Sequence, residues 1–333
     1  MMDITQVRLE KGMYALNKSF TETLEALDPS DRYAGTDLEG LDAFQRQLKR
    51  FDIRLTGPDG DAVEKFFQTA DSAVLFPEYV ARAVRQGVRE VDLIPQITAA
   101  VTDIRGLDYR SIASVPSDDD KSLKVTAEGA SIPQTRVTTQ ENLIRLRKRG
   151  RMLVSSYEAI RGQRLDVFTV MLRQIGAYIA RTQLEDAVDV LLHGDGNHNA
   201  AEHVRGSGDF DYDKLLRLWA AMRPCELTTM LVSPATGLRI LSMDAFRDAA
   251  AGLNFHGTGR LVTPFGAELI ISEAVDDEIV IGLDRRAALE LVTSGGVVTE
   301  HDKLIDRQLT RTAVTATYGF AKLTPDAVKV LEV

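Results

Sequence analysis

The densest group of residues that could do chemistry lies just past the middle of the chain. His193, Asp195, His198 and His203 place three of the five histidines and one carboxylate within eleven residues. Imidazole and carboxylate are ligands that Zn²⁺ accepts, so one hypothesis is a metal-dependent hydrolase built on this cluster. The competing interpretation is a polar loop that caps a helix, with glycines for tight turns. We favour the loop and expect no metal.

Other catalytic signals are weak in this sequence. The run Asp118 to Asp120 lacks the spaced ligands and closing glutamate of a calcium loop, so a solvated turn is expected. The chain has no GxxxxGK[ST] phosphate loop, no GxGxxG after a strand and no GxSxG nucleophile elbow. Its single cysteine, Cys225, excludes an internal disulfide and is expected to be a small core residue. We therefore expect no enzyme, no catalytic residue and no cofactor.

The strongest cluster of charge is basic. Arg145, Arg147, Lys148, Arg149 and Arg151 give five cations in seven positions, and strand alternation puts the four arginines on one face. They would repel one another unless an acidic surface lies opposite. Three alternatives remain open: a solvated face, contact with DNA, or ion pairs with another copy of the chain. We favour the third, because a net charge of -9 supplies acidic surface and arginine forms bidentate pairs.

This basic segment is predicted to be the return arm of a long hairpin spanning 116–155. On the outgoing arm Leu123, Val125 and Ala127 alternate with polar residues. An isolated two-stranded ribbon is only marginally stable in water, so the hairpin needs an outside partner. The tip residues expected to contact a neighbouring subunit are Glu128, Gly129, Ile132 and Pro133.

The first sixty residues read as two helical pieces divided by a turn at 28–30, where Asp-Pro disfavours helix. The second piece has an apolar stripe at helical spacing, which must bury against something. Packing on the chain's own core and docking on a neighbouring subunit both remain open. The stripe consists of Leu38, Leu41, Phe44, Leu48 and Phe51, of which Leu41, Phe44 and Leu48 are the candidate contacts.

Several elements are expected to position these surfaces. A helix that begins near Pro77 would bury Tyr79, Val80, Ala83, Val84 and Val88. The strongest helical periodicity runs from Leu165 to Leu192, about 42 Å at ~1.5 Å per residue, with Gly194 as its C-cap. Residues 210–283 alternate helical and strand-like patches, at 212–222, 229–232, 234–243, 267–272 and 279–283, and Leu309 to Thr317 alternates as a strand. The chain therefore combines a long strut, an α/β lobe and closing strands.

Composition narrows the class of protein. At 333 residues the chain exceeds the usual size of one core, so we expect two or more lobes. It has no apolar run near the ~20 residues of a membrane helix and no signal peptide, which predicts a protein made and kept in the cytoplasm, without membrane contact. The acidic net charge disfavours a dedicated nucleic-acid binder but permits weak, non-specific contact.

The order of parts from 66 to 333 resembles the major capsid proteins of tailed bacteriophages, which have the Hong Kong 97-type fold. Four stretches carry the resemblance. They are DSAVLFPEYV; AEGASIPQ followed by IRLRKRGRMLVSSYEAI; the helix LDVFTVMLRQIGAYIARTQLEDAVDVLLHGDG; and the closing IDRQLTRTAVTATYGFAKLTPDAVKVL.

The resemblance implies an α+β fold with an N-terminal arm, an extended β-hairpin loop, a peripheral domain with a long spine helix, and an α/β axial domain. The expected segments are 1–65 (N-terminal helical segment), 66–115 (arm and start of the peripheral domain), 116–155 (extended loop), 156–209 (spine helix and following loop), 210–283 (axial domain) and 284–333 (return strands of the peripheral domain).

The function implied is structural: copies self-assemble through pentamers and hexamers into an icosahedral head around phage DNA, in the host cytoplasm. Gly129, Pro133 and Gly150 would be hinges. Scaffold and portal proteins are expected partners, cement proteins are a further candidate, and packaged double-stranded DNA would touch the shell weakly. Because the last asparagine is Asn254, we expect no Lys–Asn isopeptide crosslink near the C-terminus. The alternative shell is an encapsulin, a nanocompartment of the same fold. Scaffolding comes from another protein, or residues 1–65 do part of that work.

Overall fold

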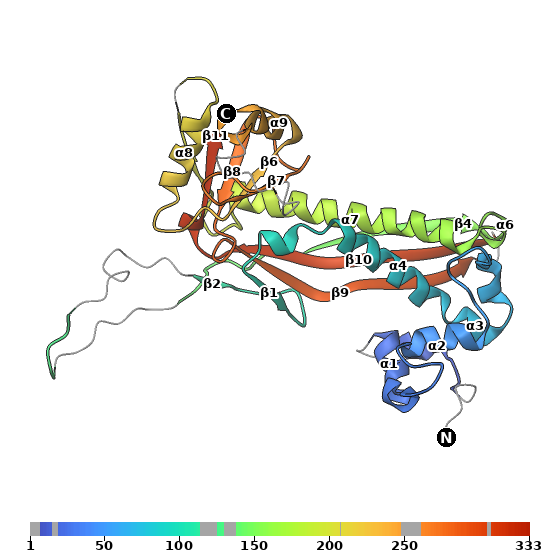
Figure 1. Cartoon of the computed structure of the whole chain (residues 1–333). Helices are drawn as coiled ribbons and strands as arrows, with labels where there is room; N and C mark the ends of the chain where they lie inside the picture. Colours follow the sequence, from blue (N-terminus) through green and yellow to red (C-terminus); the bar gives the residue numbers. More distant parts are fainter. Residues whose placement is uncertain are drawn as a thin grey trace. The chain divides into compact units, whose positions relative to one another are not determined.

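The computed structural model describes residues 7–14, 19–113, 125–129, 138–206, 208–247, 261–304 and 308–333. They belong to two compact units (Figure 1). The first unit comprises 1–91, 149–180 and 297–316, and the second comprises 92–148, 181–296 and 317–333. The chain therefore has the two lobes that its length predicts, and each unit is assembled from three separate stretches of sequence.

Helices dominate the first unit. Three of them begin at a side chain that accepts a hydrogen bond from the backbone N–H three residues on: Ser19 before α1, Asp42 before α2 and Thr69 before α3. The helices are α1 (Phe20–Leu27), α2 (Ala43–Arg50), α3 (Ala70–Ala73), α4 (Phe76–Val91), α6 (Tyr157–Arg161) and the start of α7 (Leu165–His193), with 3₁₀ turns at Lys11–Tyr14, Ser30–Tyr33 and Val63–Phe67.

The apolar stripe of the N-terminal segment packs on the chain's own core. Helix α2 begins only at Ala43, so the observed helix is shorter than the predicted apolar stripe. Phe44 and Leu48 are 1% and 5% exposed and belong to a cluster that includes Leu24 of α1 and Phe76 of α4. These two side chains are therefore buried within the subunit. Leu41 is half-buried.

A buried cation holds the same segment together. The guanidinium of Arg46 is fully buried, lies 2.9 Å from the Asp28 carboxylate, and donates to the Asp28 and Leu41 carbonyls. It also donates to the Ser30 hydroxyl and stacks over the Tyr33 ring. Because a buried charge is costly without partners, Arg46 fixes the turn at 28–33 against α2.

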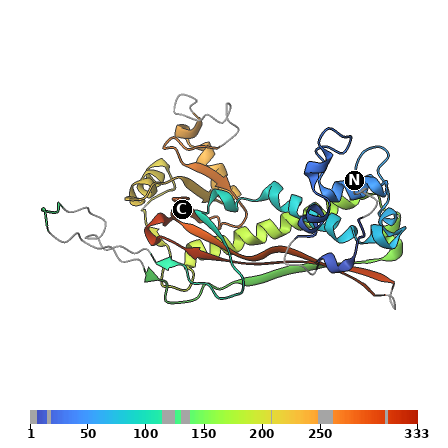
Figure 2. The ribbon, with the colours of Figure 1, turned by 90° about the horizontal axis from the view of Figure 1, so that it is seen from below.

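Two helices of the first unit touch backbone to backbone. Figures 1 and 2 show α4 lying alongside α7. A Cβ on Gly87 of α4 would lie 2.0 Å from the Arg173 carbonyl oxygen, and one on Gly176 of α7 would lie 2.1 Å from the Val84 carbonyl oxygen. Glycine at both positions is therefore required for this approach. The predicted burial of Tyr79, Val80, Ala83 and Val84 on α4 is confirmed, whereas Val88 is only half-buried.

The second unit is built on a five-stranded sheet in the order β5-β11-β8-β6-β7. Helices α8 and α9 contribute Leu218 and Ile240 to its core. The predicted bounds of β6 and β8 are confirmed, and α8 and α9 end within one residue of their predicted ends. The elements are β5 (Glu202–Val204), α8 (Tyr212–Ala221), β6 (Thr229–Val232), α9 (Pro234–Ser242), α10 (Asp244–Arg247), β7 (Glu268–Ile271), β8 (Ile279–Leu283) and β11 (Val328–Glu332), with 3₁₀ turns at Ile94–Gln96 and Pro325–Ala327.

The last strand differs from the prediction. We expected 284–333 to return to the peripheral domain, but β11 pairs antiparallel with β8 and parallel with β5 in the five-stranded sheet. Its residues Val328, Val330 and Leu331 are fully buried there. Alternation predicts that a strand exists but does not name its partner, since sheet pairing is non-local.

A second sheet has four strands in the order β1-β9-β10-β4. Strand β1 runs parallel to β9, with Ala100 opposite Glu290. The strands are β1 (Ala100–Asp103), β4 (Arg147–Ser156), β9 (Leu289–Leu304) and β10 (Leu309–Lys322). The strand predicted from Leu309 is confirmed, and so is the long helix, since α7 begins at Leu165 and ends one residue beyond the predicted Leu192.

Gly87→Ala or Gly176→Ala should lower the unfolding free energy by about 1–3 kcal/mol, although alanine is the better helix former. The new methyl meets a carbonyl that can retreat only if the helices separate. Chemical denaturation of the unassembled subunit measures the change. Gly162→Ala is the matched control, because its Cβ would meet nothing within 4 Å. Equal stability of the three variants would contradict the close helix contact.

Candidate assembly surfaces

The extended loop ends earlier in the sequence than predicted. Strands β2 (Ile112–Ala113) and β3 (Thr138–Thr139) pair antiparallel, with Ile112 opposite Thr139. The predicted return arm is wrong in its partner, because β4 is an edge strand of the four-stranded sheet, beside β10. A run of alternating residues can pair with any strand whose edge is open, so sequence proximity misled the assignment. The loop is therefore the excursion between β2 and β3.

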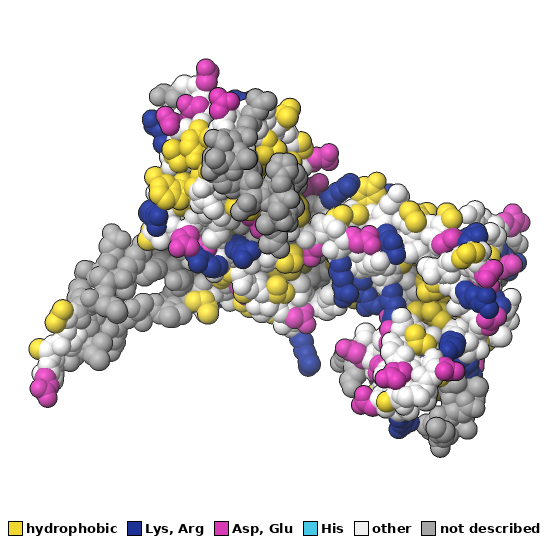
Figure 3. Space-filling model, in the orientation of Figure 1, with side chains coloured by type: hydrophobic (Ala, Val, Ile, Leu, Met, Phe, Trp, Pro, Cys, Tyr) yellow, Lys and Arg dark blue, Asp and Glu magenta, His cyan; other side chains and the backbone are white. Residues whose placement is uncertain are grey.

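The described tip of this excursion is exposed throughout. Residues 125–129 are all exposed, Val125 fully so, and Gly129 has a φ of 82° in a turn. Figure 3 shows exposed hydrophobic and acidic side chains on this described segment. Ile132 and Pro133 lie outside the described residues. Glu128 and Gly129 are thus the candidate contacts that the structure describes.

The basic segment divides into paired and exposed cations. Arg147 lies 2.8 Å from Asp186 and 3.5 Å from Asp189, so one of the predicted inter-subunit cations is engaged within the chain. Arg145, Lys148 and Arg151 are exposed, and within the described ranges no carboxylate lies within ion-pair distance of them; Arg149 is exposed as well. The mutual repulsion inferred from sequence is therefore partly relieved by the subunit's own acids.

Gly150 has a packing role in this segment. It lies within β4, and a Cβ there would come 2.7 Å from Cγ2 of Thr315 on β10. The close approach of two strands therefore explains the glycine without a hinge. Gly129 keeps the positive φ that suits a hinge, while Pro133 is among the residues not described.

The histidine cluster is dispersed in the structure. His193 lies 3.0 Å from Asp189 on its own helix, and His203 lies 3.1 Å from Glu332. The Asp195 carboxylate accepts from the backbone N–H groups of Asn197 and Lys322, at 3.1 and 2.8 Å. Across the described part of the chain, no three His, Cys, Asp or Glu side chains are grouped to hold a metal ion.

The turn after α7 caps the helix, as the polar-loop interpretation predicted, and it also binds another segment of the chain. Gly194 caps the helix with a φ of 84°. The Gln140 side chain donates to the Asp195 carboxylate at 3.2 Å, and Asn142 donates to the Asn197 side chain at 2.8 Å and to the Gly196 carbonyl at 2.9 Å. The polar residues of this turn therefore bind the chain that returns from the extended loop.

Lys322 is buried beside this turn. Its side chain is 1% exposed, and the ammonium donates to the Leu191 carbonyl at 3.3 Å. Burial lowers its pKa to about 8, Asp195 opposes the shift, and Lys329 adds to it. The ammonium is thus a costly buried charge at neutral pH.

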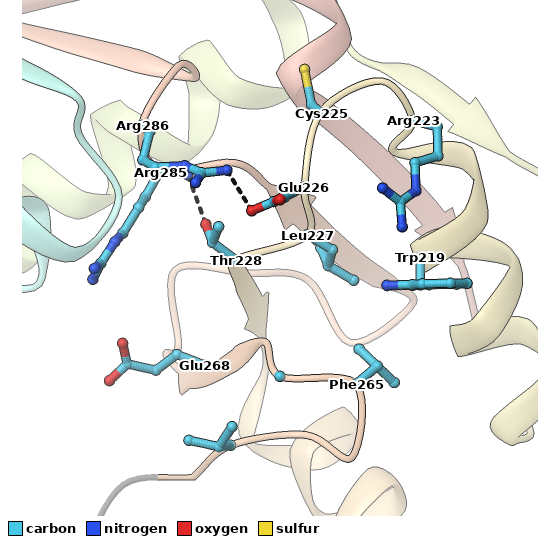
Figure 4. Close-up of a pocket in the computed structure, with 12 residues that line it drawn as sticks. Trp219, Arg223, Cys225, Glu226, Leu227, Thr228, Phe265, Glu268, Arg285 and Arg286 are labelled. Carbon is cyan, nitrogen blue, oxygen red and sulfur yellow. Dashed lines mark hydrogen bonds and ion pairs between the residues drawn. The ribbon is translucent and has the colours of Figure 1, made fainter.

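A hollow of about 500 Å³ lies in the five-stranded lobe beside Cys225. In Figure 4 Arg286 points at Glu226, 2.7 Å away, while Arg223 lies over the Trp219 ring on another wall. The hydrogen bonds that the Arg286 guanidinium donates to Asp284 and Glu226 raise the pKa of Arg286 above its ordinary value. Cys225 is half-buried on this wall, not in the core as expected. The residues that line the hollow include no histidine.

Sequence reasoning missed one exposed surface. Val167, Val170, Met171 and Tyr178 of α7 are all exposed, at helical spacing. The signal was present, because these residues recur on a second face of a helix that was treated only as a strut.

The sequence matches a known protein family. A model of the phage capsid protein family matches residues 139–331, more than half of the chain. The chain belongs to the phage capsid protein family. Among curated proteins, none matches the sequence. The hydrolase hypothesis is therefore wrong, and the protein is the major capsid subunit of a phage-like icosahedral head.

Solved structures agree on the fold of this capsid protein. The virus-like particle from Pyrococcus furiosus is 13% identical with a TM-score of 0.52, covering 77% of this chain and 98% of that one. The capsid of a native GTA particle is 13% identical with a TM-score of 0.53, covering 75% and 90%. At these identities the similarity shows the Hong Kong 97-type α+β fold alone. Within the described residues of this virion protein, no helix is long and apolar enough to cross a bilayer.

Stability of the unassembled capsid subunit should rise between pH 8 and 10.5 through Lys322. In that window the unfolded chain keeps a proton that the folded chain has released, so raising the pH favours the fold, by up to about 3 kcal/mol in total. Denaturant unfolding at pH 7.5 and 9.5 measures this. Lys322→Met should lose this increment, while Lys49→Met, at an exposed position, should keep it. Identical pH profiles for wild type and Lys322→Met would contradict the burial effect.

Proposed function

We propose that copies of this capsid protein contact one another through the extended loop between β2 and β3. The observation that carries the proposal is the described tip, where Val125 through Gly129 are exposed and Val125 is fully so. A two-pair ladder is too small to stabilise an excursion of this length in water. Burial against a neighbouring subunit would supply the missing apolar contact.

The basic segment is the proposed receiving surface for an acidic neighbour. Arg145, Lys148 and Arg151 are exposed along or next to β4, an edge strand on which Met152 and Val154 are also exposed. The loop carries acidic residues, with Glu128 at the tip and Asp118 to Asp120 before it. Opposite charges on the two surfaces would set the register between copies, as charge complementarity does at other interfaces.

These cations have two alternative roles, which the experiment below distinguishes. Exposed Lys and Arg on an edge strand also prevent unwanted strand pairing. The same cations could bind packaged double-stranded DNA weakly through its phosphates. The subunit's acidic net charge favours contact with another copy, since each copy then brings both surfaces.

The family relationship supports a wider set of partners as proposals. Copies would form pentamers and hexamers that close the shell, and closed symmetry would bring the same loop and basic segment together at every interface. Scaffold, portal and cement proteins belong to this proposal. Because Phe44 and Leu48 are buried in the subunit, a scaffold that docks on the N-terminal segment would contact its other, exposed residues.

The purified chain expressed alone should assemble into closed particles, or into rings of five and six. Light scattering followed by negative-stain microscopy measures this. A stable monomer that also stays monomeric with a co-expressed scaffold would contradict self-assembly of the chain.

Arg145→Glu, Lys148→Glu and Arg151→Glu together should leave a folded subunit with at least a tenfold loss of assembled particles, because the receiving surface changes sign. Circular dichroism and sedimentation measure folding and assembly. The matched control reverses three scattered, exposed arginines, Arg32, Arg105 and Arg217, which changes the net charge equally. Equal assembly of the two triple variants would refute the role of the basic segment. Assembly of the first variant into shells that retain less DNA would assign these cations to DNA.

A further inference from the structure

A buried glutamate holds the outgoing arm of the extended loop. Glu290 on β9 is 5% exposed and accepts hydrogen bonds from three hydroxyls. The donors are Thr102 on β1 at 2.5 Å, Tyr109 at 2.6 Å and Ser111 at 2.5 Å. Tyr109 and Ser111 immediately precede β2, where the loop begins. A single carboxylate therefore ties the start of the loop to the four-stranded sheet.

Three hydroxyl donors satisfy this buried carboxylate. A buried carboxylate is costly unless several donors reach it, and here three hydroxyls supply charge-assisted hydrogen bonds. Burial and the hydrogen bond to Glu290 raise the pKa of Tyr109 above its ordinary value, which keeps the phenol protonated as a donor. Alanine at 290 would leave all three hydroxyls, including the buried Ser111, without this acceptor.

The return arm is held by a second carboxylate. Gln140, which follows β3, is 6% exposed and donates to the Asp195 carboxylate and to the Lys322 carbonyl, both at 3.2 Å. Asp195 is fixed in turn by the backbone N–H of Lys322. The turn after α7 thus binds the returning chain as Glu290 binds the outgoing one.

The two anchors meet at the base of the loop. The Gln140 N–H donates to the Ser111 carbonyl at 2.9 Å, and the Ile144 N–H donates to the Tyr109 carbonyl at 2.8 Å. Ser111 and Gln140 are therefore bound both to each other and to separate carboxylates. Figure 1 shows β2 at this base, where the excursion leaves the sheet.

We propose that Glu290 and Asp195 form a two-point anchor that sets the direction in which the extended loop leaves the subunit. Glu290 is then a positioning residue for assembly: it touches no neighbour but orients the segment that does. This inference rests on the proposed function of the loop. Its physical basis is that a loop attached at two rigid points enters an interface with less orientational freedom to lose.

Amide hydrogen exchange on the unassembled subunit tests the anchor. Glu290→Ala should speed exchange at Gln140 and Ile144 at least tenfold, while exchange at β6 and β8 changes less than threefold. Glu290→Gln, which keeps one acceptor oxygen, should give a smaller increase. Should Glu290→Ala fail to fold, Tyr109→Phe removes one donor from the loop side with little change in shape and should also speed exchange at Ile144.

The matched control is Asp284→Ala. Asp284 is also a 5% exposed carboxylate of the second unit, but its partners are Arg286 and the Glu226 N–H, away from the loop. It should leave exchange at Gln140 and Ile144 within threefold of wild type. Local exchange in Glu290→Ala equal to that in Asp284→Ala would overturn the anchor.

Assembly measurements separate this inference from the proposed function. Glu290→Ala should form fewer closed particles than Asp284→Ala at matched thermal stability. Normal particles from Glu290→Ala, despite faster local exchange, would overturn its role in positioning. Replacing 114–137 with a short linker tests the loop itself: normal shells from that variant would refute the loop's function, whatever the exchange data show for the anchor.

Discussion

The cost of burying charge organises this protein. A charged side chain removed from water must bring its partners with it, and here those partners come from distant parts of the chain. Glu78 on α4 binds Thr21, Arg82 and Arg85. Asp186 on α7 binds Arg147 and the Tyr318 hydroxyl. Each buried charge is thus a point where separate segments are held in register, within one unit or the other.

The subunit combines segments that are held by buried, paired charges with a loop tip that is exposed. The side chains of Arg46, Glu78 and Asp186 each have partners within the subunit. The tip at 125–129 is exposed. A shell subunit needs this division, because a stable body must present surfaces that are completed only by other copies. Interfaces between copies of the subunit would bury this exposed tip.

Local periodicity predicted many of the helices and strands of the fold. The apolar spacing from Leu165 located α7 to within one residue at each end, and short apolar runs located β6 and β8. It failed where the partner mattered. Residues 38–51 show one apolar stripe, yet the helix begins only at Ala43, where the Asp42 cap satisfies the free N–H groups. The return arm predicted at the end of the 116–155 hairpin does contain a strand, β4, but its partner is β10 and not the outgoing arm of the loop.

The sequence by itself determined the kinds and positions of most elements and the lack of a catalytic motif, since composition and periodicity are local properties of the chain. The class of structural shell protein came from the resemblance carried by four of its stretches. Only the tertiary structure decided that β11 completes the five-stranded sheet, that Arg147 is paired within the subunit, and that Glu290 gathers three hydroxyls. The physical reason is that strand pairing and the pairing of buried charge depend on which distant segments meet. A glutamate among the apolar residues of β9 signals that a partner is required, but does not name it.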